Sequence, residues 1–198
     1  PLFGLEHRRP VRDYDILGFT LQSELTYTNL LTVLDLSGLP LRQDRRAEGD
    51  PLVCIGGPCA SNPEPLAPFV DFALIGDAED AIGEILEIVA ESRGRTGRQH
   101  VLQRLATEVR GVYVPSLYEV TSTGRTPRPK ASAPGATPFP VVARKVPVLR
   151  PEDHPSRMVV SLTETTHDRL PIEVMRGCMR GGRFCQAGYL YLPARERE

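Results

Sequence analysis

The sequence lacks any long apolar run. Its longest uncharged apolar stretches are a few residues long, such as Phe72-Ala73-Leu74-Ile75. A helix that crosses a bilayer needs about 20 such residues, so the sequence predicts no membrane-spanning helix. The chain also opens without a signal-peptide pattern, and we therefore expect a cytoplasmic protein.

Net charge is lacking as well. The 24 Lys and Arg residues nearly balance the 25 Asp and Glu residues, which gives a formal net charge of −1. A chain so close to neutrality has no overall electrostatic attraction to nucleic acid or to an anionic membrane. The charge therefore predicts neither of these as a partner.

Cysteine is scarce. The four cysteines are Cys54, Cys59, Cys178 and Cys185. Because no secretory signal accompanies them, disulfides are not expected, and metal or redox chemistry gains weight. Cys54 ends an apolar run and Cys59 lies in a loop, and buried free cysteine is common, so a structural role is the simpler interpretation for both.

The first part of the chain alternates segments with strand character and segments with helix character. Apolar runs predict strands over residues 15–20, 52–55 and 72–75, and helical spacing predicts helices over residues 25–36, 82–89 and 101–107. In the second helix, the spacing marks Ile82, Ile85, Leu86 and Val89 as the apolar face. This alternation predicts a Rossmann- or flavodoxin-like α/β domain over residues 1–112, with a parallel sheet between layers of helices.

Three glycines follow the predicted strands. Gly56 and Gly57 come after the second strand, and Gly76 comes after the third. In parallel α/β sheets, ligands bind outside the carboxyl ends of the strands, where small residues let a cofactor approach the backbone. The alternative is that these glycines make tight turns, and the pattern alone leaves both interpretations open.

Proline dominates the middle of the chain. After a predicted edge strand at Gly111–Pro115, eight of the 19 prolines fall between Thr121 and Pro155. Proline fixes φ and cannot donate a backbone hydrogen bond. Residues 113–167 are therefore predicted to be an edge strand followed by an extended or poorly packed linker.

A second strand-to-loop segment follows this linker. Leu170–Met175 alternates apolar and other residues, which predicts a strand, and it runs directly into a loop framed by Cys178 and Cys185. Taken alone, a C-x6-C pair is a weak signal for a metal. A four-cysteine zinc site that also used Cys54 and Cys59 is a poor match to structural zinc spacing.

The flanking residues make the loop more specific. It resembles the cluster-binding loop of radical-SAM proteins, which hold a [4Fe–4S] cluster with three cysteines spaced C-x3-C-x2-C. The Arg176-Gly177 pair before the first cysteine, Phe184 before the last, and Gln186-Ala187-Gly188 after it are typical of radical-SAM proteins with an N-terminal B12 (cobalamin)-binding-like domain. Gly56-Gly57-Pro58 and Ile75-Gly76-Asp77 resemble the ligand-side loops of that domain. The resemblance covers nearly the whole chain and is closest to an uncharacterised subfamily.

The resemblance carries several expectations. It implies that residues 168–198 are the first strand and cluster loop of a radical-SAM (β/α) barrel, in a chain truncated at both ends. It implies Cys178 and Cys185 as metal ligands, Phe184 against the adenine of S-adenosylmethionine, and cobalamin as a further candidate cofactor near Gly56, Gly57 and Gly76. No catalytic residue is assigned. The missing remainder of the barrel would be the natural partner.

Two features depart from the family pattern. The middle cluster position is Gly182, which offers no ligand, and the cobalamin signature Asp-x-His-x-x-Gly does not occur. The sequence therefore leaves two functions open. One is a fragment of a radical-SAM enzyme that would bind a [4Fe–4S] cluster and cleave S-adenosylmethionine to a 5′-deoxyadenosyl radical, with an unknown substrate. The other is a non-catalytic remnant or binding module with a defective cluster loop.

Overall fold

The computed structural model describes residues 2–121, 128–131, 137–155, 157 and 172–197. The chain divides into two compact units, Pro1–Lys145 and Val146–Glu198. Among the described residues, no helix combines the length and the apolar character that crossing a membrane requires.

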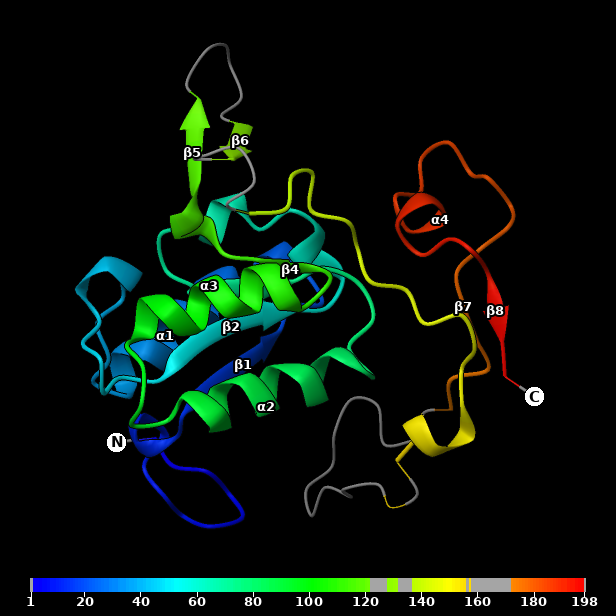
Figure 1. The fold of residues 1–198 in the computed structure, drawn as a ribbon. Helices are drawn as coiled ribbons and strands as arrows, with labels where there is room; N and C mark the ends of the chain where they lie inside the picture. Colours follow the sequence, from blue (N-terminus) through cyan, green and yellow to red (C-terminus); the bar gives the residue numbers. More distant parts are fainter. Residues whose placement is uncertain (1, 122–127, 132–136, 156, 158–171, 198) are drawn as a thin grey trace. The chain divides into compact units, whose positions relative to one another are not determined.

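The first unit is built on a four-stranded sheet (Figure 1). In spatial order its strands are β1 (Ile16–Thr20), β2 (Leu52–Gly56), β3 (Phe72–Leu74) and β4 (Val112–Tyr113). The first three strands are parallel, with Leu17 facing Val53 across the first pair, which confirms the predicted parallel pairing. The edge strand β4 is antiparallel to β3, so the sheet is mixed at one edge.

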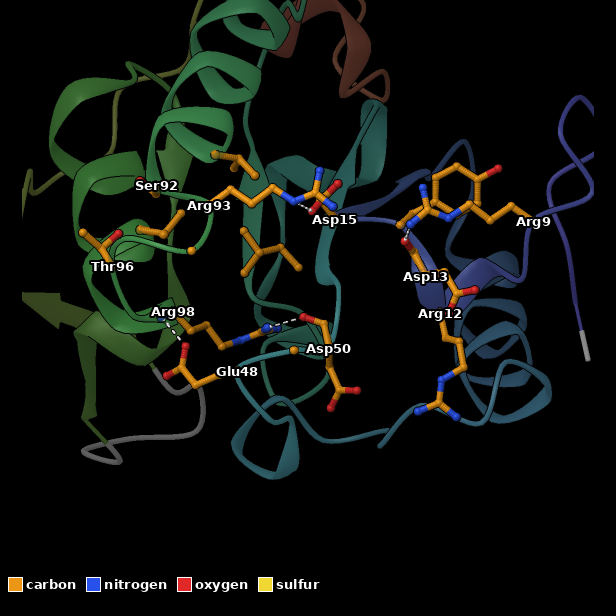
Figure 2. Close-up of a pocket in the computed structure, with 16 residues that line it drawn as sticks. Arg9, Arg12, Asp13, Asp15, Glu48, Asp50, Ser92, Arg93, Thr96 and Arg98 are labelled. Atoms are coloured by element: carbon orange, nitrogen blue, oxygen red, sulfur yellow. Dashed lines mark hydrogen bonds and ion pairs between the residues drawn. The ribbon is translucent and has the colours of Figure 1, made fainter.

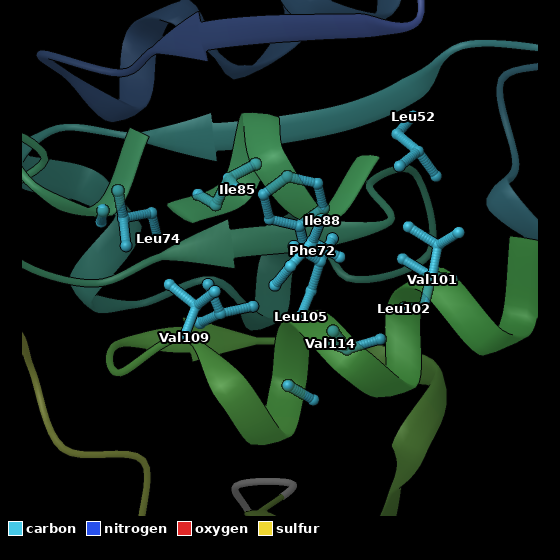
Figure 3. Packing of buried hydrophobic residues seen from close by; sticks show 13 residues of the cluster. Leu52, Phe72, Leu74, Ile85, Ile88, Val101, Leu102, Leu105, Val109 and Val114 are labelled. Atoms are coloured by element: carbon cyan, nitrogen blue, oxygen red, sulfur yellow. The ribbon is translucent and has the colours of Figure 1, made fainter. Parts of the chain in front are cut away.

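Helices cover both faces of this sheet. They are α1 (Tyr27–Leu36), α2 (Ala81–Ser92) and α3 (Arg98–Glu108). Because successive strand residues point to opposite faces, Leu52 and Phe72 pack with α2 and α3, whereas Val53 and Ile55 pack with α1. Figure 3 shows the first of these two clusters, with Phe72 surrounded by side chains of both helices. The result is the three-layer α/β arrangement predicted from the alternation of segments.

The buried face of α2 differs from the one predicted. Ile85 and Ile88 are buried in the core, but Ile82 and Leu86 are 53% and 54% exposed. The helix presents only a narrow stripe to the sheet, because its core contacts come from residues three and four apart. Helical spacing therefore predicted the helix correctly but predicted a wider buried face than the structure has.

The predicted linker contains ordered structure. Within it, β5 (Tyr118–Thr121) and β6 (Arg128–Ala131) form an antiparallel pair. Further on, the Arg144 amide donates to the carbonyl of Ile75, and the Asp77 amide donates to the carbonyl of Arg144, both at 2.9 Å. The described part of this segment is therefore extended, which is one of the two predicted alternatives, and its backbone satisfies polar groups beyond the end of β3. Residues 122–127, 132–136, 156 and 158–167 of the predicted linker lie outside the described residues.

The second unit contains short elements. These are β7 (Met175–Arg176), α4 (Ala187–Leu190) and β8 (Arg195–Glu196), with β7 antiparallel to β8. The predicted strand over 170–175 is wrong for its described part before Met175, and residues 170 and 171 lie outside the described residues. Ile172 and Val174 are 65% and 66% exposed. A two-stranded ribbon gives too little pairing to extend the strand over these side chains.

A buried ion-pair triad joins distant parts of the first unit. Asp71, which directly precedes β3, is 1% exposed, and its carboxylate pairs with Arg46 at 2.9 Å and with Arg98 at 2.7 Å. The same carboxylate accepts a 2.7 Å hydrogen bond from the amide of Val53. Arg46 also donates to three loop carbonyls, and Arg98 donates to the carbonyls of Asp50 and Pro51. The triad therefore ties the amino ends of β2 and β3 to the start of α3.

We expect Asp71→Ala to lower the free energy of unfolding by about 3–5 kcal/mol, because removing one partner leaves two buried guanidinium groups uncompensated. Urea denaturation followed by circular dichroism measures this change. Asp44→Ala, which breaks the exposed Arg42–Asp44 pair, is the matched control and should leave the midpoint nearly unchanged. Equal effects of the two substitutions would contradict a structural role for the triad.

Candidate functional site

The loop after β7 carries the two cysteines of the predicted cluster site. Cys178 follows β7 closely, and Cys185 begins the turn that leads into α4. The amide of Cys185 donates to the carbonyl of Gly182 at 3.1 Å, and the amide of Arg180 donates to the Cys178 sulfur at 3.5 Å. These local hydrogen bonds order the loop around the two cysteines. Both thiols are half-buried, and each is therefore still accessible to a ligand.

The donor set of this loop is one ligand short of a cluster site. Among the described residues, no three His, Cys, Asp or Glu side chains gather closely enough to hold a metal ion. A Cβ atom built on Gly182 would lie 3.8 Å from the Cβ of Cys185 and 3.6 Å from the Phe184 ring, which are ordinary contacts. The position therefore has room for a third side chain beside Cys185, but glycine supplies none.

Phe184 is the most exposed large apolar side chain of this loop, at 97%. Phe184 therefore packs into no core among the described residues, and its predicted contact with an adenine ring stays a prediction. Nearby, Arg176 is engaged by Glu173 at 2.9 Å, and Arg180 and Arg183 are exposed. The loop thus presents an aromatic ring and two cationic side chains to solvent around its thiols.

The three glycines predicted at the ligand edge differ in their surroundings. A Cβ on Gly56 would have nothing within 4 Å, so the backbone there is open. A Cβ on Gly57 would lie 3.1 Å from the carbonyl oxygen of Leu21, and one on Gly76 would overlap the backbone of Arg144 at 2.0 Å. Gly76 also has φ +109°, which favours glycine. The protein backbone thus occupies the approaches to Gly57 and Gly76, and a cofactor role for these glycines stays a prediction.

Arg144 is the residue at this edge that the sequence did not single out. Its guanidinium forms two 2.7 Å hydrogen bonds with the carboxylate of Glu84 on α2, and Asp80 lies 3.8 Å away. Bidentate pairing of this kind fixes both position and orientation. No sequence signal predicts it, because the two partners are 60 residues apart.

A polar pocket of about 590 Å³ lies at the opposite, amino edge of the sheet (Figure 2). Its walls include Asp15 before β1 and Asp50 before β2. Arg93 pairs with Asp15 at 3.3 Å, and the backbone amide of Arg98 donates to Glu48 at 2.6 Å. The lining carries four arginines and four carboxylates, so its formal charge is balanced and favours no ligand of either sign. Sequence reasoning had placed the ligand edge at the carboxyl ends and missed this cavity.

The other two cysteines sit in the α/β unit. Burial raises the pKa of Cys54 to about 12, and the nearby Asp71 carboxylate adds to the shift. Burial also raises the pKa of Cys59, with a further contribution from Glu24. Thiolate is the form that reacts and binds metal, so both groups fit the structural role that the sequence predicted for them.

A family of known proteins matches the first part of the chain. The family described as radical SAM proteins, N-terminal, matches residues 1–115. The match spans more than half of the chain and covers the α/β sheet through its edge strand β4, but not the loop from Cys178 to Cys185. No curated protein matches the chain.

We expect Cys54 to resist alkylation in the folded protein. Because its pKa is raised to about 12, Cys54 is almost entirely in the unreactive thiol form at pH 8. Treatment with iodoacetamide at pH 8, followed by peptide mass spectrometry, should leave Cys54 unmodified until urea unfolds the chain. The same labelling in urea is the control, and rapid native labelling of Cys54 would contradict its burial.

Proposed function

The chain belongs to the radical SAM proteins, and we propose that it is the N-terminal part of a radical-SAM enzyme whose cluster loop is framed by Cys178 and Cys185. The observation that carries the proposal is the short strand-to-helix loop that presents both half-buried thiols in a chain whose α/β unit matches this family. When bound, the [4Fe–4S] cluster of such an enzyme supplies the electron that cleaves S-adenosylmethionine to a 5′-deoxyadenosyl radical.

Each loop residue has a role in this proposal. Cys178 and Cys185 would bind iron as thiolates, the usual protein ligands of iron–sulfur clusters. The exposed ring of Phe184 would cover the adenine of S-adenosylmethionine, and the exposed Arg180 and Arg183 would offset the negative charge of a thiolate-ligated cluster. The substrate stays open.

A second function is favoured by one specific observation. Since Gly182 supplies no ligand and the described residues hold no third donor beside the two thiols, this chain can act as a binding module that retains the fold without the chemistry. Its partner would then be the remainder of a radical-SAM barrel. Cobalamin is not part of either proposal, because the signature Asp-x-His-x-x-Gly, which supplies a histidine to cobalt, does not occur in the sequence.

The substitution Gly182→Cys tests the proposed cluster loop. We expect it to raise the iron bound after anaerobic reconstitution toward about four per chain, with the broad visible absorbance of a [4Fe–4S] centre, because it adds a thiolate where the backbone already leaves room. Iron and sulfide analysis with visible spectroscopy measures the change.

Met179→Cys is the matched control, because it adds a third thiol to the same exposed loop at the wrong spacing. It should not restore the cluster. The comparison should be repeated in a chain extended by the remaining radical-SAM barrel, which would shield the loop from water. Unchanged iron content for Gly182→Cys in both contexts would reject a cluster site and leave the binding-module function.

A further inference from the structure

Residues 137–145, here called the latch, continue the pairing of β3 beyond the point where β4 leaves it. β4 pairs with Ala73 and Leu74, and its neighbour Gly111 still accepts a hydrogen bond from the Ile75 amide. The next pair along the edge is formed by Gly76 and Arg144, which make a parallel bridge. The latch, which is distant from β3 in the sequence, therefore pairs with the backbone just beyond the carboxyl end of β3.

Two glycines provide the space in which the latch lies. A Cβ on Gly76 would overlap the Arg144 backbone at 2.0 Å, and one on Gly111 would lie 3.2 Å from the Arg144 nitrogen. Both have positive φ, +109° and +93°, which a side chain disfavours. The sheet edge is thus shaped to accept the backbone of Arg144.

The contacts that hold the latch in that space are mainly polar. They include the two backbone hydrogen bonds of Arg144, its bidentate pair with Glu84, and a 2.7 Å hydrogen bond from the Tyr118 hydroxyl to the Pro138 carbonyl. Its apolar contacts include the Phe139 ring, 6.3 Å from that of Tyr118, and Val141, which is partly buried against the core. Phe139 and Val142 are 54% and 53% exposed, and Thr137, at 7%, is its one buried residue.

By contrast, the strands beneath the latch carry the core. Val53, Phe72 and Ala73 are fully buried. Segments with few buried apolar contacts and surface-exposed hydrogen bonds open with a lower free energy than the core of the same domain. The latch is therefore expected to open with a lower free energy than the sheet.

We propose that residues 137–145 form a releasable latch, clasped by Arg144 and Glu84, whose opening exposes the backbone of Ile75–Asp77 while the sheet stays folded. In the closed state, the Asp77 amide and the Ile75 carbonyl are occupied by Arg144. These groups lie at the carboxyl edge, where parallel α/β sheets bind ligands. The latch thus controls access to that edge of the α/β unit and acts independently of the cluster loop.

Amide hydrogen exchange in the full chain tests the latch. In the unaltered protein, the amides of Asp77 and Arg144 should exchange together and faster than those of β1 to β3. Glu84→Ala should accelerate both amides roughly tenfold, because a net stabilising charged hydrogen-bond pair is lost, and should leave the strand amides unchanged. Glu87→Ala, an exposed glutamate on the same helix, is the matched control and should change neither group.

Trypsin provides a second measurement that needs no resonance assignment. Cleavage after Lys145 should be faster in Glu84→Ala than in Glu87→Ala, while the α/β fragment survives. Arg144→Lys, which keeps the charge but loses the bidentate geometry, should show a smaller change in the same direction. Two results would overturn the proposal. One is that the Asp77 and Arg144 amides exchange as slowly as the strand amides, and the other is that Glu84→Ala accelerates the exchange of all amides equally.

Discussion

The carboxylate of Asp71 is the group on which the arrangement of the first unit depends. It lies 1% exposed between two guanidinium groups and also accepts the Val53 amide. A buried carboxylate is tolerated only when it is paired and hydrogen-bonded, and here every contact comes from a different segment. Satisfying this one group therefore requires the loop before β2, the start of β3 and the first turn of α3 to meet at one point, which also closes one wall of the polar pocket through Arg98.

Different contacts complete the amino and the carboxyl edges of the sheet. At the amino edge, the triad fixes the strand ends and leaves a charged but balanced cavity between them. At the carboxyl edge, β4 pairs only with Ala73 and Leu74, and the Ile75 carbonyl and the Asp77 amide form their hydrogen bonds with Arg144 instead. Buried backbone groups must be satisfied, and the chain meets this need with a proline-rich segment rather than with a regular strand. The edge where α/β folds take their ligands is therefore the edge with the weakest internal support.

The second unit carries reactive and charged side chains but has a small apolar core. Its thiols, exposed ring and exposed arginines lie on one loop, whereas the order of the unit comes largely from polar contacts. Glu173 is shared by Arg176 and Arg197, which lowers its pKa, chiefly through the hydrogen bond from Arg176. Such a ribbon positions a loop but excludes little water, and iron–sulfur clusters depend on burial as well as on thiolate ligands. Binding a cluster thus has two separate requirements, a third cysteine and the shielding of the loop from water.

The sequence by itself determined the α/β alternation, the parallel pairing of three strands, the edge strand and the pair of thiols on one loop, because each rests on local spacing of residues along the chain. It did not determine which side chains complete the structure. Asp71 meets Arg46 and Arg98 across 25 and 27 residues, and Arg144 meets Glu84 across 60. It also left open whether Gly76 makes a tight turn or faces a ligand, and it did not indicate that Arg144 pairs with the backbone there. Only the tertiary structure decided these points, since the partner of a buried charge or an unpaired backbone group is set by proximity in space, and no periodicity in the sequence encodes that proximity.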